Sequence, residues 1–488
     1  MFKQYSFFGR FAVAVCMASS IIPFAAIAQQ APAASDESTL EPLTFDEMLV
    51  LDGKSYAKIY SIGLEEAMRR VLVMNDTTES VDTLSSEFGG KVGGQYFTHG
   101  ADFGLKMRLT GPEKQASRRL IGNQAVKQQR QAARQAEKLG ARDASKAARI
   151  AARRQALGIL DSQVALAETV SDQPIELTVQ FLADAPADRD AVVQAISTRV
   201  PDIQSRIPSV DAVAYDERRG SVVVTVVGSS GSVTPAVQDV IAAMFPVPVA
   251  YQFVSKRLGV TAATGGTPNY TLSGTPWCTN AFVGYDSANR PGIFSASHCR
   301  WSGASSIGMN YKDTNGTTTE LGVDPNLSAW TTLGDMLFLT LAAGLSPSSQ
   351  FFADKGTAAR LLTGRRTMTT TSVKSGTTAG SMVCFYGRTT GPVSGQSCGE
   401  VVAKGVVLTL SASEPMMTAG SGTSYYVAVQ GPSTTMKCQG GDSGAPWFAL
   451  SIAWGTMSRC AENWVGSDSY AYYTSMDAAY AKSYRLSY

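Results

Sequence analysis

The chain has 488 residues, with 42 Lys and Arg against 40 Asp and Glu, a formal net charge of +2 and a hydrophobic fraction of 44%. This length leaves room for two or three domains, each with its own core. A charged fraction of only 17% with this many apolar residues excludes a disordered chain, and the balanced charge argues against a nucleic-acid binder along the whole chain. With only two histidines, His99 and His298, we expect no histidine-based metal site.

The first 28 residues have the pattern of a signal peptide. Lys3 and Arg10 are basic, residues 11–22 are mostly apolar, and a small-x-small motif ends at Ala28, where we expect cleavage. The alternative, lipidation at Cys16, is weakened by the bulky residue before that cysteine. No other stretch approaches the ~18 apolar residues of a membrane helix. We therefore expect a secreted, extracellular product without a membrane span, which passes through the periplasm if the host is Gram-negative.

A cysteine-free region follows, and its patterns predict an α/β structure. Residues 57–74 have the apolar spacing of an amphipathic helix, and residues 94–110 alternate as strands do. Further on, a strand at 174–182, a helix near 188–200 and a strand at 221–229 follow one another. We divide the region into an N-terminal portion (29–112), a basic helical insert (113–160) and a C-terminal α/β lobe (161–260).

The basic segment 113–154 stands out within this region. It holds twelve Lys and Arg against three acidic residues, and its Ala, Gln and Arg content favours helix. Such a charge run is typical of contact with nucleic acid or an anionic surface, and equally of a solvated spacer helix. Both interpretations stay open here, with the spacer favoured because charge runs are usually solvated faces.

Composition changes near Lys256, and the segment 261–488 is predicted to be all-β. Gly, Ser and Thr become abundant, and short apolar runs recur between turn residues, as in a barrel or a sandwich. The strand-sized runs are AFVGYD, MLFLTLA, SMVCFYG, GVVLTLSA, YYVAVQG and APWFALSIAWG, and MDAAYAKSY could close the chain as a short helix.

All six cysteines that remain after signal cleavage lie in this segment. An even number in an exported chain indicates disulfides. Fifteen connectivities are possible for six cysteines. Neighbours in sequence are the economical choice, each closing a short loop that adds roughly 3 kcal/mol. The economical pairs are Cys278–Cys299, Cys384–Cys398 and Cys438–Cys460.

Three sites in the all-β segment carry residues for acyl transfer. His298 ends an apolar strand, Asp335 opens another, and Ser443 lies in a glycine-rich turn. A serine hydroxyl needs a base to take its proton, and a buried carboxylate orients that base. Asp324 is a rival acid, but its GVDPN setting is typical of a turn. A catalytically silent homologue that only binds ligands is the other interpretation, against which the complete set of residues argues.

These motifs resemble those of a known family. SASHC and QGGDSGAP are similar to segments of the chymotrypsin-type serine peptidases, and CFYGRTTGPVSGQSCG is similar to the α-lytic protease and streptogrisin branch. The resemblance implies a double β-barrel, His298 as general base, Asp335 as its partner and Ser443 as nucleophile. It also implies that the N–H groups of Gly441 and Ser443 bind the oxyanion, and that Arg388 pairs with Asp442, although a surface position for Arg388 remains open. No cofactor is needed.

Substrate specificity is not readable from these motifs. The spacing between Cys438 and Ser443 differs from that of the family branches, so the base of the primary pocket cannot be carried over. Lys437 is one candidate there, and a cation would favour acidic side chains; the side chain could equally point outward. Further pocket candidates by resemblance are Ala453, Trp454, Gly455 and Ala471.

The resemblance also gives the cysteine-free region a role. In the α-lytic branch, a large pro-region assists folding and inhibits the enzyme until it is removed. The strand and helix alternation over 174–229 resembles such a pro-region in outline, and GGQYFTHGADFGLKMRLTG is similar to its N-terminal portion, whereas the basic insert at 113–154 departs from it. We expect cleavage between about 256 and 266, a monomeric mature enzyme acting on proteins or peptides, and no nucleic-acid partner for that enzyme.

Overall fold

The computed structural model describes residues 41–488 with nine gaps. The gaps are 141–143, 258–266, 272–275, 301–308, 313–317, 342–347, 355–357, 368–376 and 411–416. The predicted signal peptide, with its cleavage site and Cys16, and most of the window predicted for pro-region cleavage lie outside the described residues. Among the described residues, no helix is long and apolar enough to cross a membrane.

Three helices open the described chain: α1 (Phe45–Tyr60), α2 (Leu64–Asp76) and α3 (Thr78–Glu87). Thr44 and Glu47 form a capping box at the start of α1, in which each side chain binds the other residue's backbone N–H. The prediction of one helix over residues 57–74 is wrong. Ser61 takes a left-handed conformation at φ 54° where α1 ends, and α2 begins after Gly63.

A four-stranded sheet follows these helices. It consists of β1 (Val92–Thr98), β2 (Gly104–Thr110), β4 (Glu176–Ala185) and β3 (Arg118–Ile121), in that order across the sheet. Between β3 and β4 run α4 (Gln124–Gly140), α5 (Ala144–Ala156) and α6 (Asp161–Asp172). The predicted strands near 94–110 are confirmed. Of the long helix predicted over 113–154, the structure has α4 and α5, whereas residues 113–123 contain β3 and no helix, and residues 141–143 lie outside the described residues.

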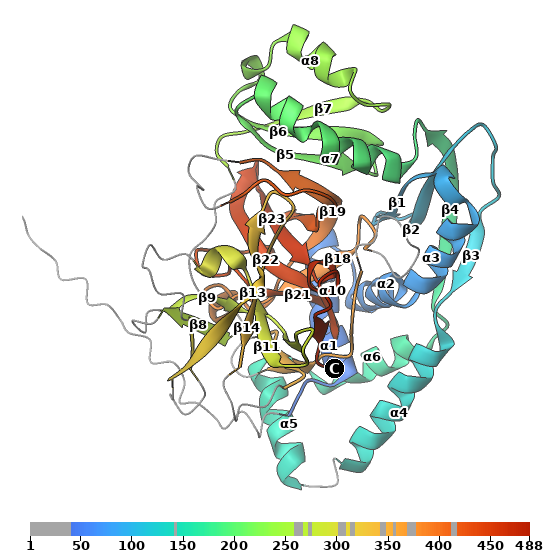
Figure 1. Cartoon of the computed structure of the whole chain (residues 1–488). Coiled ribbons are helices and arrows are strands. Elements are labelled where there is room, and N and C mark those ends of the chain that lie inside the picture. The colour runs from blue at the N-terminus through green and yellow to red at the C-terminus, as the bar shows by residue number, and fades with distance from the viewer. Residues whose placement is uncertain are drawn as a thin grey trace, which may run out of the picture. The chain divides into compact units, whose positions relative to one another are not determined.

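A second α/β unit joins the C-terminal strands directly. It contains α7 (Arg189–Arg206), β5 (Val210–Asp216), β6 (Ser221–Val227), α8 (Pro235–Ala242) and β7 (Val249–Val254). Val192 and Ile196 of α7 pack with Val224 of β6 in one core. The edge strand β5 pairs antiparallel with β19, with Val213 opposite Val407, so this sheet continues into the C-terminal sheet (Figure 1).

The C-terminal part is built from strands in two large sheets. The first has eight strands: β24 (Arg485–Leu486), β10 (Val283–Tyr285), β11 (Pro291–Ser295), β14 (Gly334–Thr340), β13 (Thr318–Thr331), β12 (Met309–Lys312), β8 (Thr267–Thr271) and β9 (Pro276–Asn280). The second runs β18 (Met382–Phe385), β21 (Pro446–Ala449), β22 (Ile452–Val465), β23 (Asp468–Ser475), β20 (Tyr426–Pro432) and β19 (Ser397–Leu408). Because β18 also pairs with β19, these six strands close into a barrel.

The all-β class predicted for this part is therefore correct. Short elements complete it: β15 (Gln350–Phe352), β16 (Ala359–Leu361), β17 (Gly364–Arg365), α9 (Gly391–Ser394) and α10 (Asp477–Tyr480). Its three disulfides are the pairs that close the shortest loops: Cys278–Cys299, Cys384–Cys398 and Cys438–Cys460. The first binds β9 to the segment after β11, and the third binds β22 to the segment before β21.

Candidate active site

His298 and Asp335 lie side by side, where β11 ends and the neighbouring strand β14 begins. β11 and β14 pair antiparallel, with Ser295 opposite Leu337, so the end of β11 lies next to the start of β14. His298 belongs to the short 3-10 helix after β11, and Asp335 is the second residue of β14. His298 Nδ1 lies 2.5 Å from Asp335 Oδ2, and the His298 backbone N–H donates to Asp335 Oδ1 at 3.0 Å.

The state of the Asp335 carboxyl decides which nitrogen of His298 carries a hydrogen. Asp335 is fully buried. Burial alone would raise its pKa, but the nearby His298 and the hydrogen bonds from His298 and Ser458 outweigh burial and hold the pKa below its usual value. An ionised carboxylate only accepts hydrogen bonds, so Nδ1 is the protonated nitrogen. In the neutral imidazole, Nε2 then has the lone pair and can take a proton.

Two hydroxyl side chains that the sequence analysis did not single out also hold Asp335. Ser458 Oγ donates to Asp335 Oδ2 at 2.6 Å, and the Asp335 N–H donates to Thr474 Oγ1 at 2.9 Å. Both come from the closed barrel, on β22 and β23, far from Asp335 in sequence. The signal that could have found Ser458 is a hydroxyl residue on the apolar strand that follows the glycine-rich turn.

The rival acid Asp324 has other partners. Its Oδ1 accepts a hydrogen bond from the N–H of Asn326, and its Oδ2 lies 3.2 Å from Arg290 Nη2. A carboxylate that binds the backbone two residues ahead stabilises a turn. Asp335 is thus the acid that contacts His298.

Ser443 lies in a glycine-rich turn between β20 and β21. Gly441 and Gly444 have φ values of 119° and 84°, a backbone conformation that residues with a Cβ rarely adopt. A Cβ on Gly444 would also lie 2.2 Å from the carbonyl oxygen of Thr279. Thr279, on β9, donates from its N–H to the Ser443 carbonyl at 2.7 Å and from Oγ1 to the Gly441 carbonyl at 3.1 Å. The turn is thereby attached to the sheet that carries His298.

A disulfide sulfur lies beside both His298 and Ser443. Cys299 Sγ is 4.0 Å from His298 Nε2 and 4.0 Å from the Ser443 carbonyl oxygen. Ser443 Oγ lies 3.5 Å from the Ser458 carbonyl oxygen, and Ser443 is fully buried in this chain. His298, Cys299 and Cys278 also have the spacing of a metal cluster. Because the two sulfurs are bonded to each other, neither is the thiolate that a metal requires.

Asp442, just before Ser443, is buried among neutral donors. Thr390 Oγ1 donates to it at 2.9 Å, and the N–H groups of Gln439, Thr389 and Thr390 donate at 2.9, 3.2 and 3.3 Å. Burial outweighs these bonds and raises the pKa of Asp442 to about 6. Arg388 lies in the same turn as Thr389, and its ion pair with Asp442 stays a prediction.

The residues suggested for the specificity pocket occupy two kinds of position. The Lys437 side chain is 40% exposed, and its Nζ lies 3.7 Å from Glu462 Oε2. The other four are buried on β22 and β23: Ala453, Trp454, Gly455 and Ala471. Their role stays a prediction. On β22, the residue that contacts Asp335 is Ser458, three positions beyond Gly455.

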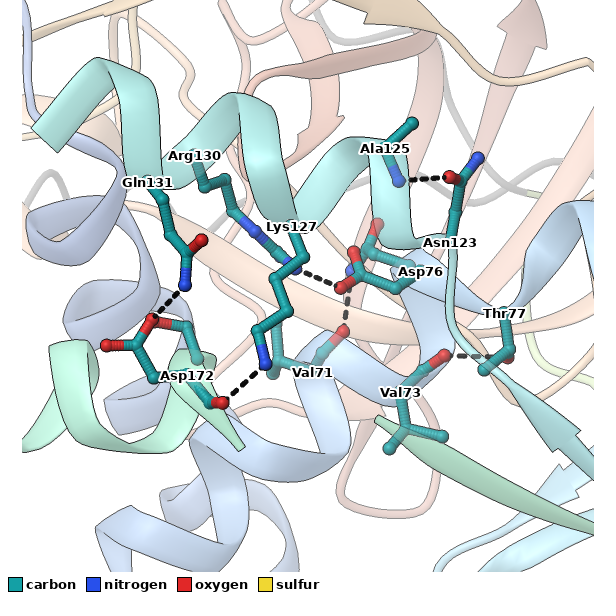
Figure 2. Close-up of polar contacts among 12 residues, drawn as sticks. Val71, Val73, Asp76, Thr77, Asn123, Ala125, Lys127, Arg130, Gln131 and Asp172 are labelled. Atoms are coloured by element: carbon teal, nitrogen blue, oxygen red, sulfur yellow. Dashed lines mark hydrogen bonds and ion pairs between the residues drawn. The ribbon is translucent and has the colours of Figure 1, made fainter. Parts of the chain in front are cut away.

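The basic helix α4 directs arginines toward acids of the first two helices. Arg130 lies 2.5 Å from Asp76 of α2, and Arg134 lies 2.5 Å from Asp46 of α1, all four side chains being less than 10% exposed. Figure 2 shows the Arg130–Asp76 contact and, beside it, Lys127 reaching the Asp172 carbonyl. α4 is therefore held against its neighbours by buried ion pairs.

α5 repeats this arrangement one helix later. Arg153 and Arg154 both contact Glu47, at 2.5 and 2.7 Å, and Glu47 is fully buried. The same Glu47 closes the capping box of α1. These cations are engaged inside the protein, which favours a structural role for the segment over contact with nucleic acid or an anionic surface.

Comparisons with known proteins show likeness in structure. No protein-family model and no curated protein matches the sequence. The chain resembles Nocardiopsis protease with 18% identity, over 46% of this chain and 98% of that one, at a TM-score of 0.32. Thermobifida fusca protease A has 21% identity, over 46% of this chain and 96% of that one, at a TM-score of 0.31. An α-lytic protease homologue has 18% identity, over 46% of this chain and 97% of that one, at a TM-score of 0.32.

These neighbours are bacterial chymotrypsin-like serine proteases. Because the identities and TM-scores are low, the role of each residue rests on the geometry described above and not on these chymotrypsin-like neighbours.

Proposed function

We propose that the chain is the precursor of a secreted serine endopeptidase that cleaves peptide bonds in proteins or peptides. The observation that carries the proposal is the 2.5 Å contact between His298 Nδ1 and Asp335 Oδ2, with the Ser443 turn attached beside it through Thr279. A neutral imidazole oriented by a buried carboxylate is a suitable general base near neutral pH. The reaction needs no cofactor.

The chemistry proceeds through an ester on Ser443. Ser443 Oγ attacks the carbonyl carbon of the scissile bond while His298 Nε2 takes the hydroxyl proton. The carbon–nitrogen bond then breaks, and the imidazolium returns that proton to the departing amine. Water attacks the acyl-enzyme, gives a proton to Nε2, and the acid product leaves as the proton returns to Ser443.

The surrounding groups stabilise charge that develops during these steps. Asp335 stabilises the imidazolium, and Ser458 holds the carboxylate that does so. The N–H groups of Gly441 and Ser443 would bind the oxyanion, at about 3 kcal/mol for each donor. In the proposed ion pair, Arg388 would offset the burial of Asp442, which otherwise disfavours its charged form.

We further propose that residues 29–260 act as a pro-region for the peptidase domain 261–488. A buried ion pair supports this: Arg360 Nη2 lies 2.8 Å from Asp52 Oδ1, and both side chains are fully buried. The Leu450 N–H donates to the same Asp52 carboxylate at 2.8 Å. In the precursor, a substitution that removes the Asp52 carboxylate would leave Arg360 as a buried cation, which is strongly destabilising. The pairing of β5 with β19 joins the same two parts.

Folding kinetics give a reason for such a helper. A barrel that closes through strands far apart in sequence, such as β18 with β21, has a high contact order and folds slowly. Residues from about 262, expressed alone, are expected to misfold unless residues 29–260 are supplied. Full activity of the isolated domain without this region would contradict the pro-region proposal.

A mass measurement tests the enzymatic proposal. The secreted product is weighed intact before and after reaction with a fluorophosphonate probe, with Ser443→Ala as the control. A species of roughly 20–25 kDa that gains one adduct only in wild type is expected, on the scale of the predicted domain length. A stable full-length product that gains no adduct would refute it.

A further inference from the structure

The Asp52 carboxylate of α1 is held by donors that belong to the C-terminal part. Arg360 Nη2 and Nη1 donate to its two oxygens at 2.8 and 3.2 Å. The Leu450 N–H and Gln396 Nε2 donate to the same two oxygens at 2.8 and 3.1 Å. A guanidinium fork, a side-chain amide and a backbone N–H thus converge on one carboxylate, which is the geometry of a binding site for that group.

The other contacts of Arg360 also come from the C-terminal part. Its Nη1 donates to the Leu450 carbonyl at 2.9 Å, and its Nη2 donates to Gln396 Oε1 at 2.8 Å. Its guanidinium carbon lies 4.6 Å from the centre of the Phe448 ring, where an aromatic face attracts a cation. These neutral neighbours hold the guanidinium in place independently of Asp52.

α1 contacts the C-terminal part along its length. Hydrogen bonds run from the Leu43 N–H to the Ala359 carbonyl, from Gln396 to Ser55 Oγ, from Lys58 to the Thr434 carbonyl and from Tyr60 to Glu400. Asp52 lies within this contact. If residues 29–260 leave, α1 leaves with them, and the Nη groups of Arg360 then face the space that the helix occupied. This step rests on the proposed function.

Leu450 presents its N–H from an unusual backbone conformation. It follows β21 and has a φ of 52°, in the left-handed region that residues with a large side chain rarely adopt. Such strain persists where the surroundings enforce it, often at ligand-binding sites. Ser443 lies before β21 and Leu450 directly after it. The carboxylate site and the candidate nucleophile therefore lie beyond opposite ends of one strand.

A cavity lies beside the Asp52 contact. Its volume is about 380 Å³, and its lining includes Ser55 of α1 together with Ser394, Gly395 and Gln396 of the C-terminal part. Gln396 is also the residue that contacts both Asp52 and Arg360. The surface next to the carboxylate site is therefore not filled by α1, and it has room for side chains other than those of α1.

We propose that Arg360, Gln396 and the Leu450 N–H form a second binding site of the processed enzyme, which takes an acidic residue on a helix of another protein. The guanidinium is charged at all relevant pH values, and its paired N–H donors match a carboxylate. Gln396 Nε2 also donates to Ser55 Oγ at 3.0 Å. Because positions three apart share a helix face, the site favours a hydroxyl residue three positions after the acid.

Helical peptides test this site. Intact mass first confirms that the enzyme has lost residues 29–260 and carries the fluorophosphonate adduct, which stops cleavage of the probes. Titration calorimetry then measures the affinity of a peptide with the sequence of residues 41–62, and of an Ala- and Gln-based helix of unrelated sequence with Asp and Ser three positions apart. Each is compared with its counterpart that has Asn in place of Asp.

The Asp forms should bind at least about tenfold more tightly than the Asn forms, in line with hydrogen bonds to a charged group. This ratio should fall close to one in the enzyme variant Arg360→Gln and stay intermediate in Arg360→Lys. It should be unchanged in Lys482→Gln, which removes an exposed positive charge elsewhere. If Arg360→Gln does not fold, the ratio in Arg360→Lys against wild type decides.

Several outcomes would overturn the proposal. They are equal affinity of the Asp and Asn forms, absence of binding, a ratio that also falls in Lys482→Gln, and binding of the 41–62 peptide but not of the unrelated helix. A processed product without an adduct would overturn the enzymatic proposal alone, since the peptide pairs still report on the site. A product that keeps residues 29–260 would overturn the proposed processing and this site with it.

Discussion

Buried charges serve different ends in the helical region and at the barrel interface. Around α4, Arg130 meets the opposite charge of Asp76, and burial still raises the pKa of that carboxyl. At the barrel interface, Asp335 holds an imidazole and a hydroxyl, and these donors keep its pKa below the usual value. In the Arg130–Asp76 ion pair, each charge is engaged by the other. In the His298–Asp335 contact only Nδ1 is engaged, and Nε2 of the neutral His298 ring can still take a proton. The number of charges in a segment therefore says less about chemistry than the atom that the pairing leaves available.

The largest expected effect comes from changing the partner of the imidazole. Asp335→Asn should lower kcat/KM by roughly 10⁴, because an amide no longer dictates a hydrogen on Nδ1. Ser458→Ala keeps the carboxylate and removes one donor, so a loss of about tenfold is expected. Steady-state kinetics on one peptide substrate measure both. Equal losses in the two variants would mean that the carboxylate has no special role.

A smaller effect, on stability, is expected for the buried Arg130–Asp76 ion pair. Arg130→Met leaves Asp76 buried without its cation and should lower the free energy of unfolding of the precursor by about 3–5 kcal/mol. The double variant with Asp76→Asn should recover much of that loss. Urea unfolding is measured in a Ser443→Ala background, so that the chain does not cleave itself. The exposed Arg119→Met serves as control, with a change of about 0.5 kcal/mol or less.

The smallest effect concerns Asp442. This buried carboxyl belongs neither to the ion pairs of α4 nor to the His298–Asp335 contact. Its pKa is raised from 3.8 to about 6, so the folded state binds this proton more tightly than the unfolded state does. The resulting stability is complete below about pH 4 and is lost as the pH rises through 6, about 3 kcal/mol in all. Asp442→Asn should remove this slope from urea unfolding curves between pH 4 and 7. The exposed Asp239→Asn should keep it.

One further variant sharpens the Asp442 measurement. If Arg388 forms the proposed ion pair with Asp442, Arg388→Gln should raise the pKa of Asp442 further, so that the loss of stability extends to higher pH. An unchanged slope in Arg388→Gln would contradict the ion pair and leave the Thr390 hydroxyl and the backbone donors as the groups that hold Asp442.

The short sequence motifs predicted the three candidate catalytic residues but not the residues that hold Asp335 in place. His298, Asp335 and Ser443 each stand in a local pattern, so the contact of the first two could be predicted. Ser458 and Thr474 have no such pattern, since their role comes from facing Asp335 across the barrel interface. The predicted helix over 57–74 failed for a local reason: the apolar spacing continues on both sides of Ser61, although the backbone turns there.

The sequence by itself determined the all-β class of the C-terminal part, the cysteines available for disulfides and the residue types needed for acyl transfer. These follow from composition, periodicity and short motifs, which act over a few neighbouring residues. Only the tertiary structure decided that two arginines of α4 and two of α5 contact buried acids of α1 and α2, that Asp52 reaches Arg360, and that Arg459 lies over Trp330. Such contacts join residues dozens to hundreds of positions apart, and burial determines whether a charge is solvated or must find a partner.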